Sequence, residues 1–308
     1  MKPTLTIGIP AYNEEGNILN LLQSIFRQSR KMFMLTHVIV ACDGCTDDTV
    51  SVVKKFAQTH SCIKLIVTEQ RSGKADALNR IYDNAQTSDY LYTTDADLVF
   101  EGKHDLEKLV TQLENNPQCV IAGPRHIPLW PETQWGRFAY VSYRSFEDAF
   151  LHWNHGNNFH TVMAAILLRG SFARSFRFPK GTISDQCYVY IKATQNNPSG
   201  FIFVSDAHVY FRPVDTFRDW RLLGIRSTAG DKDDVLKHFG NTILPAITIP
   251  KQLVILSLCK WMLKSPWYTF GSLLMNIGIR LFPYKKTSIN KGMWEPTQSS
   301  KKGLHLSI

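Results

Sequence analysis

The sequence predicts an α/β protein with a mixed, mostly parallel sheet and helices on both faces of that sheet. Two observations support this. Short runs rich in β-branched residues alternate with segments whose apolar residues recur at helical spacing. Acidic and glycine residues gather directly after several of the apolar runs. An alternating strand–helix order places the strands in parallel, and ligands of such sheets bind beyond the carboxyl ends of the strands.

The predicted elements follow one another closely along the first 100 residues. The expected strands cover residues 5–9, 37–41, 64–67 and 90–94, and the expected helices cover residues 18–26, 47–56 and 74–85. Residues 117–213 are less regular and rich in aromatic residues, and we expect them to extend the sheet and form a second wall of the cleft. The predicted organisation is a catalytic-type domain over residues 1–235, a basic amphipathic region over 236–290 and a mobile polar tail over 291–308.

The composition fits a folded protein with an anionic partner. Hydrophobic residues make up 44% of the chain and charged residues 20%, which excludes a disordered protein. The net charge of +9 is uneven, because no Asp or Glu occurs between Val235 and Trp294. Such a basic region indicates an anionic partner, either a membrane surface with anionic lipids or a polyanion. No nucleic-acid partner is expected.

The cysteines and the first residues of the chain indicate a reducing compartment. Cys42 and Cys45 form one C-x-x-C pair without a second pair, so we interpret them as packing residues rather than a zinc site. The chain begins with an expected strand and shows no charged-then-apolar leader. A cytoplasmic location is therefore expected.

Two acids, Asp95 and Asp97, end the apolar run of residues 90–94. If the strand continued through them, their side chains would point the same way. Two neighbouring carboxylates repel each other unless a cation lies between them, and oxygen ligands suit Mg²⁺ or Mn²⁺. This pattern therefore predicts a metal site. Taken by itself, the pattern also fits two surface acids that bind nothing.

A basic turn at Arg71-Ser-Gly-Lys74 precedes one of the expected helices. It is not a P-loop, because the required first glycine is replaced by Thr68. Two cations at the start of a helix still suit a diphosphate, and a solvated basic turn is the alternative. Asp43, at the end of another expected strand, could accept hydrogen bonds from a nucleobase or ribose.

These motifs together resemble one enzyme family. The order P-A-Y-N-E-E, V-I-V-A-C-D-G-C-T-D-D-T, R-S-G-K-A-D-A-L-N and T-T-D-A-D-L resembles the family 2 glycosyltransferases of the GT-A fold over roughly residues 4–230. The resemblance implies a Rossmann-like domain that transfers a sugar from a nucleotide sugar, with inversion at the anomeric carbon.

The resemblance also implies roles for individual residues. The nucleotide pocket would be lined by Pro10, Ala11, Tyr12 and Glu14, Asp43 would recognise the base, most often uracil, and Arg71 and Lys74 would lie near the diphosphate. Asp95 would support the sugar, and Asp97 would ligate Mn²⁺ or Mg²⁺, which would neutralise the leaving diphosphate.

Three further residues, Asp185, Arg226 and His208, concern the acceptor side and the metal. Where the family carries an acidic pair, this chain has Ser184-Asp185, and Asp185 is the expected general base that deprotonates an acceptor hydroxyl. The Q-x-x-R-W motif of processive members is reduced to Arg226, which favours transfer of a single sugar and leaves Arg226 as a phosphate or acceptor contact or a surface residue. His208 follows Asp185 at a distance at which some GT-A enzymes place an extra metal ligand, and a packed histidine is the alternative.

The C-terminal region contains apolar segments that are too short to span a bilayer. The longest uncharged run, residues 265–279, has 15 residues, and its apolar side carries Phe270, Leu274 and Ile277 opposite Ser272. This pattern predicts helices that lie on an anionic membrane and bring a membrane-embedded acceptor to the cleft. A helix pair that covers the domain and a dimer contact are the alternatives, and the sequence leaves the oligomeric state open.

The sequence thus predicts a metal-dependent glycosyltransferase that is peripheral on the cytoplasmic face of a membrane. Its expected donor is a nucleotide sugar, most often a UDP-sugar. The expected acceptor is a lipid-linked or glycan hydroxyl. The alternatives are transfer to a polyprenyl phosphate, a sugar nucleotidyltransferase, whose glycine-rich N-terminal loop is absent, and a non-catalytic scaffold.

Overall fold

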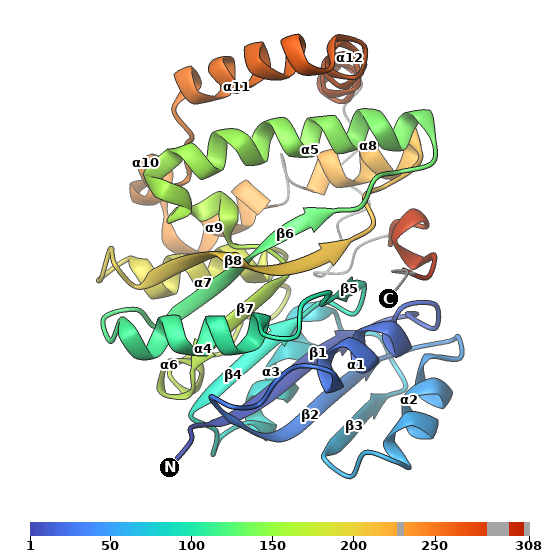
Figure 1. Ribbon diagram of the computed structural model, residues 1–308, viewed down its shortest axis with the longest axis vertical. Coiled ribbons are helices and arrows are strands. Elements are labelled where there is room, and N and C mark those ends of the chain that lie inside the picture. Colours follow the sequence, from blue (N-terminus) through green and yellow to red (C-terminus); the bar gives the residue numbers. More distant parts are fainter. Residues whose placement is uncertain (227–230, 282–295, 305–308) are drawn as a thin grey trace.

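The computed structural model describes residues 1–226, 231–281 and 296–304 (Figure 1). An eight-stranded sheet has the order β3-β2-β1-β4-β7-β6-β8-β5. Strands β1, β2, β3 and β4 pair in parallel, as do β6 and β8, whereas β7 is antiparallel to β4 and β6, and β5 is antiparallel to β8. The predicted mixed, mostly parallel sheet is confirmed.

The N-terminal half follows the predicted strand–helix alternation. Its elements are β1 (Thr4–Ala11), α1 (Ile18–Phe26), β2 (Met34–Asp43), α2 (Thr49–Ala57), β3 (Ile63–Thr68), α3 (Lys74–Asn84) and β4 (Tyr90–Thr94). Strand β1 is buried along almost its whole length, which explains its near-continuous apolar sequence, because both faces of a parallel sheet are covered.

The second half widens the sheet and adds helices. Its strands are β5 (Leu98–Val99), β6 (Ile121–Pro128), β7 (Ala165–Arg169) and β8 (Phe201–Phe211). Its α-helices are α4 (Asp105–Asn115), α5 (Gln134–His152), α6 (Gly170–Arg174), α7 (Asp185–Thr194), α8 (Phe217–Ile225), α9 (Asp231–Phe239), α10 (Leu244–Ile247), α11 (Lys251–Lys264) and α12 (Pro266–Leu281). Short 3₁₀ turns are η1 (Trp153–Gly156), η2 (Phe159–Thr161), η4 (Asn241–Ile243) and η6 (Ser299–Lys301).

Two apolar cores lie on opposite faces of the sheet. Helices α1, α2 and α4 cover one face, and α3, α7, α9 and α10 contribute to the core on the other. Val235 of α9 and Ile247 of α10 belong to the second core. The boundary expected at residue 235 therefore falls inside α9, and the chain as far as α10 packs with the sheet.

Helices α5, α11 and α12 form a separate layer, drawn at the top of Figure 1, away from β3. Thr133 caps α5 by accepting a hydrogen bond from the Gly136 amide at 3.0 Å. Helix α12 approaches α5 closely at Gly271, where a Cβ atom would lie 2.2 Å from the Phe138 ring. A glycine is therefore needed at this crossing.

Candidate active site

The carboxyl ends of β1, β2 and β4 meet at one edge of the sheet, as the parallel order requires. The residues that follow them are the segment from Pro10 to Glu14 after β1, Asp43 at the end of β2, and the segment from Asp95 to Asp97 after β4. The three sequence motifs predicted to form a site thus lie at the same edge.

Asp43 holds the basic turn in place. Its carboxylate accepts hydrogen bonds from the Ser72 amide at 2.9 Å, the Ser72 hydroxyl at 2.7 Å, the Gly73 amide at 2.7 Å and the Arg80 guanidinium at 3.2 Å. Burial alone would raise the pKa of Asp43, but these hydrogen bonds outweigh it and the pKa is lowered. The sequence predicted a contact to the nucleobase here, whereas the observed contacts fix the loop that carries Arg71 and Lys74.

The turn after Asp43 requires a glycine. Gly44 has a φ of +69°, and a Cβ atom at this position would lie 2.5 Å from the Arg71 amide nitrogen. The guanidinium of Arg71 in turn lies 3.9 Å from the centre of the Tyr12 ring. Tyr12 and Arg71, predicted separately from two motifs, therefore form one flat, cationic surface at the sheet edge.

Asp95 and Asp97 were expected to point to the same side if the strand continued through them. The strand does not continue, because β4 ends at Thr94 and a tight turn follows. Asp95 pairs with Lys74 at 2.6 Å. Asp97 instead lies close enough to Glu14 for its charge to raise the pKa of that residue. The turn thus directs the two acids to different partners.

Lys74 connects the two predicted sides of the site. Besides Asp95 it pairs with Asp185 at 3.1 Å, and Asp185 stands in the first turn of α7. The second carboxylate oxygen of Asp185, Oδ1, is buried and has no hydrogen-bond partner among the described residues. Burial raises the pKa of Asp185, the Asp95 charge adds to this, and Lys74 and Arg226 oppose it. The charge of Arg226 therefore acts on Asp185, and its expected contact to a phosphate or acceptor stays a prediction.

Glu14 and Asp97 are two buried acids, the acidic pair, which lie within electrostatic reach of each other and of the Lys301 ammonium. Burial and then the Asp97 charge raise the pKa of Glu14 to about 7, and burial and then the Asp95 charge raise the pKa of Asp97 to about 6. Lys301 opposes both shifts, forms an ion pair with Glu14 and donates to the Tyr12 carbonyl at 2.8 Å. Two buried acids whose charges act on each other, one of them already paired with a cation, fit a hard divalent ion, which would take its remaining ligands from phosphate and water.

Protein ligands alone do not form a complete cage. No group of three or more His, Cys, Asp or Glu side chains placed to hold a metal occurs in residues 1–226, 231–281 and 296–304. His208 lies on β8, where its Nε2 atom hydrogen-bonds to the Ser205 carbonyl at 3.1 Å. Its contacts in the described part of the chain do not bring it to Asp97, so the structure gives the predicted metal role of His208 no support.

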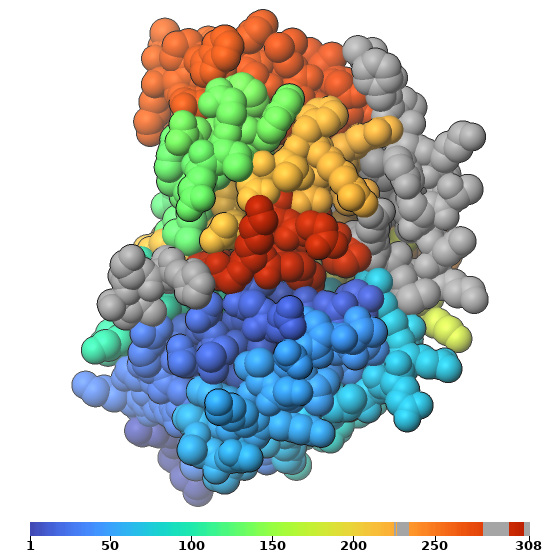
Figure 2. Space-filling model, turned by 90° about the vertical axis from the view of Figure 1, so that its right-hand side faces the viewer, coloured from blue at the N-terminus to red at the C-terminus, as the bar shows by residue number. Residues whose placement is uncertain are grey.

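Lys301 was missed by the sequence analysis. Residues 296–304, the C-terminal segment, were expected to belong to a mobile tail, but they lie between the N-terminal part of the molecule and the region of α8 (Figure 2). In the structure the polar groups of these residues have partners: Ser299 is 1% exposed and its amide donates to Asp219 at 2.7 Å. Nothing in the local sequence around Lys301 signals a partner that is 287 residues away.

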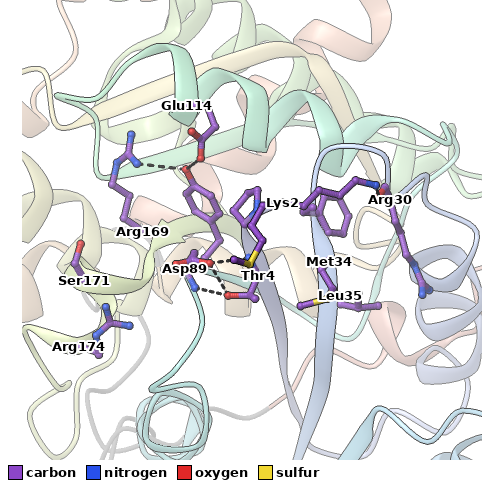
Figure 3. Close-up of a pocket in the computed structure, with 14 residues that line it drawn as sticks. Lys2, Thr4, Arg30, Met34, Leu35, Asp89, Glu114, Arg169, Ser171 and Arg174 are labelled. Carbon is purple, nitrogen blue, oxygen red and sulfur yellow. Dashed lines mark hydrogen bonds between the residues drawn. The ribbon is translucent and has the colours of Figure 1, made fainter.

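A large cavity of about 1090 Å³ lies at the opposite, amino-terminal ends of the strands and not at this site (Figure 3). Its cations are already engaged: Arg169 donates to the Tyr90 hydroxyl at 3.3 Å and Arg174 donates to the Ser88 carbonyl at 3.1 Å. Asp89 accepts from the Thr4 hydroxyl at 2.7 Å. The cavity therefore lacks the arrangement of reactive groups seen at the carboxyl ends.

Comparison with known proteins decides the family. The sequence model described as "Glycosyl transferase family 2" matches residues 6–176, more than half of the 308 residues. The chain belongs to this family. It is therefore a glycosyltransferase of the GT-A fold, as the motifs predicted.

Curated relatives of this glycosyltransferase match over its N-terminal part. Glycosyltransferase AglD of Haloferax volcanii is 30% identical over 127 residues, 40% of this chain and 20% of the relative. A 4,4'-diaponeurosporenoate glycosyltransferase of Staphylococcus aureus is 33% identical over 126 residues, 40% of this chain and 32% of the relative. The match thus spans no more than about a third of the length of either relative.

Solved structures share the fold of this glycosyltransferase over most of the chain. A mannosyltransferase from Pyrobaculum calidifontis, solved with GDP-Man and Mn²⁺, has a TM-score of 0.55 and 20% identity and covers 92% of this chain and 77% of its own. Glucosyl-3-phosphoglycerate synthase from Mycobacterium tuberculosis, solved with Mn²⁺, UDP and glucosyl-3-phosphoglycerate, has a TM-score of 0.53 and 18% identity over 77% of this chain and 80% of its own.

Proposed function

We propose that this glycosyltransferase moves a single sugar from a nucleotide sugar, UDP-linked by preference, to a hydroxyl of a lipid-linked or glycan acceptor, with inversion. The observation that carries the proposal is the chain of contacts Asp95–Lys74–Asp185 beside the acidic pair Glu14 and Asp97. It joins groups suited to a diphosphate to a buried carboxylate suited to a base.

The donor would lie across the ends of β1, β2 and β4. The surface of Tyr12 and Arg71, with Pro10 and Ala11 beside it, would hold the base, and Asp43 would act by fixing the turn that carries Arg71 and Lys74. Lys74, which lies between Asp95 and Asp185, would meet the diphosphate. The related structures with UDP and GDP-Man support a nucleotide in this fold.

Glu14 and Asp97 would hold Mn²⁺ or Mg²⁺. When bound, the cation would neutralise the charge that develops on the departing diphosphate. Both carboxylates are buried enough for their pKa values to be raised, and a fixed cation favours their charged forms. The structures of relatives that contain Mn²⁺ support this choice of ion.

Asp185 would be the general base. Its free Oδ1 atom has no other hydrogen-bond partner in the described part of the chain and can accept the proton of an acceptor hydroxyl. Lys74 holds the other oxygen and so fixes the carboxylate. Attack from the side of Asp185, opposite the leaving diphosphate, would invert the anomeric carbon. A polyprenyl phosphate acceptor is already an anion and would need no such base.

The layer of α11 and α12 supports a membrane-bound acceptor, because its outward face carries many exposed apolar side chains. On the inner side these helices bury Trp261 and Met275 together with the small polar residues Ser257 and Ser272, and the Ser257 hydroxyl donates to the Ser145 carbonyl at 2.5 Å. Their outward side chains are apolar, with Leu263 88% exposed. Other strongly exposed apolar residues here are Ile255, Leu256, Trp267, Phe270, Leu274 and Ile277. An exposed apolar face of this size is typical of a surface that meets lipid or a partner.

These helices would lie on the membrane instead of crossing it. The segment Asn241–Lys264 is long and apolar enough to span a bilayer, with a mean hydropathy of 1.6, but Pro250 separates α10 from α11. Helix α11 has 14 residues, about 21 Å of helix against a hydrocarbon core of about 30 Å. Lys251 and Lys264, which are both exposed, would meet anionic headgroups of the cytoplasmic leaflet, whereas Lys260 pairs with Asp148 of α5 at 2.7 Å.

The experiment that tests the proposal is nucleotide release from a panel of UDP-, GDP- and dTDP-sugars with Mn²⁺, Mg²⁺ or a chelator. We expect slow release from one donor, lost with chelator and reduced on the order of 10²-fold or more in Asp97→Ala. Asp206→Ala is the matched control, since the Asp206 side chain is 67% exposed on β8, and it should behave as wild type. Release that is equal with chelator and in Asp97→Ala would contradict the metal role, and no release from any donor would contradict the proposal.

A further inference from the structure

The C-terminal segment, residues 296–304, touches both sides of the proposed donor site. On the side of β1 and α1, Asn17 donates to the Ser300 carbonyl at 2.7 Å and Asn20 donates to the Leu304 carbonyl at 2.9 Å. On the side of β8, the Arg212 guanidinium donates to the Gly303 carbonyl at 3.0 Å. Figure 2 shows the segment, in red, lying across the face between these two parts.

The segment is anchored by buried polar contacts, not only laid over the surface. The Ser299 hydroxyl donates to Asp215 at 2.7 Å and also to Asp219, and Lys302 pairs with Asp215 at 2.8 Å. Leu304 is 2% exposed. This set of contacts resembles that of a bound peptide, with main-chain carbonyls held by side-chain amides and with a buried apolar anchor.

The position of Lys301 coincides with the place proposed for the metal. Its ammonium pairs with Glu14 and donates to the Tyr12 carbonyl, and its charge also acts on Asp97. An ammonium and a divalent cation repel each other and compete for the same carboxylate oxygens. While Lys301 pairs with Glu14, it therefore competes with a divalent cation for that carboxylate.

We propose that the C-terminal segment is an intramolecular occupant of the donor site, in which Lys301 takes the place of the divalent cation and must leave before cation and nucleotide bind. The inference rests on the proposed function, because it assumes that the donor binds at this edge. It makes Lys301 a competitor of the cation and not a ligand of the diphosphate. Because the donor binds only after these contacts are broken, their free energy lowers the apparent affinity for the donor.

Two variants release the segment in different ways. Lys301→Gln removes the ammonium and keeps a side chain of similar length. Gly16→Ala leaves every charge in place, but its Cβ atom would lie 2.7 Å from the Lys301 carbonyl oxygen, so the backbone of the segment has to move. Lys54→Gln, at an exposed position on α2, is the control for the loss of one positive charge.

The measurement is the binding of UDP together with Mn²⁺ to the full chain by titration calorimetry. We expect Lys301→Gln and Gly16→Ala to bind roughly threefold or more tightly than wild type, and Lys54→Gln to bind as wild type does. Hydrogen exchange of residues 296–304 should speed up in wild type when Mn²⁺ and UDP are added, because the segment loses its partners.

Weaker binding by Lys301→Gln would make Lys301 a phosphate ligand and overturn the inference while leaving the proposed function intact. Unchanged binding in both release variants, or unchanged exchange of the segment, would overturn it as well. Absence of binding by wild type and all three variants would contradict the proposed function itself, and the inference with it.

Discussion

Asp43, Asp95, Asp97 and Asp185 show what can be predicted for single residues. Each was identified from a motif, and each lies at the carboxyl edge of the sheet or in the first turn of α7. Their pairings could not be predicted, because they depend on where a strand ends. β4 ends one residue before Asp95, which pairs with Lys74, whereas the charge of Asp97 acts on Glu14.

His126, a residue that the motifs did not mark, gives a prediction at the same scale. It is 3% exposed on β6, and its Nδ1 atom contacts the Pro124 carbonyl at 3.1 Å. Burial lowers the pKa of His126 from 6.5 to about 4, although the Pro124 carbonyl and the Asp95 charge oppose this. The folded protein thus keeps the ring neutral down to about pH 4, whereas the unfolded chain takes up a proton below pH 6.5. The stability of the fold is therefore full above pH 6.5 and decreases as the pH falls from 6.5 toward 4.

As the pH falls from 7 to 5, we therefore expect the titration of His126 alone to lower the free energy of unfolding by about 2 kcal/mol. His126→Asn keeps a donor for the Pro124 carbonyl but cannot titrate, so its stability should fall less over this range. Urea unfolding at the two pH values measures this, with His152→Asn on the exposed end of α5 as the control. An equal fall in wild type and His126→Asn would contradict the assignment.

At the scale of elements, the strands and helices of the N-terminal half were predicted closely, since each carries its own period of apolar residues. The expected strand at residues 90–94 coincides with β4, and the expected helix at 74–85 differs from α3 by one residue. The layer formed by α5, α11 and α12 was predicted only as amphipathic helices. Which side of each helix meets α5 depends on tertiary packing, and here small polar residues such as Ser257 and Ser272 are buried beside Trp261 and Met275.

The exposed apolar side of α11 and α12 should bind lipid vesicles. The double variant Leu263→Glu and Trp267→Glu places two anions where side chains are 88% and 65% exposed, so it should leave the fold intact. We expect wild type to sediment with vesicles that contain phosphatidylglycerol and the variant to lose roughly tenfold in partition, because apolar burial and attraction to anionic lipid are both weakened.

Val67→Glu is the matched control, since Val67 is 50% exposed on β3, away from this layer (Figure 1). It should sediment as wild type does. Equal sedimentation of the double variant and wild type, or failure of wild type to bind these vesicles, would contradict a lipid-facing role for α11 and α12.

For the molecule as a whole, the motif order predicted the GT-A fold and the family, because the motifs sit at strand ends whose spacing the fold fixes. The path of the C-terminal segment could not be predicted. Lys301 and Glu14 are separated by 287 residues. Their contact depends on the many hydrogen bonds and ion pairs that hold residues 296–304 in place. The contact also joins the two walls of the site, since the segment bonds to both α1 and the region of α8.

The measurement that tests the central claim most directly is the anomeric configuration of the sugar first released when wild type hydrolyses an α-linked nucleotide sugar, followed by NMR. A single displacement guided by Asp185 predicts the β anomer first and, in Asp185→Asn, a rate lower on the order of 10²–10⁴-fold with donor binding retained. The α anomer first, or an unchanged rate in Asp185→Asn, would contradict it.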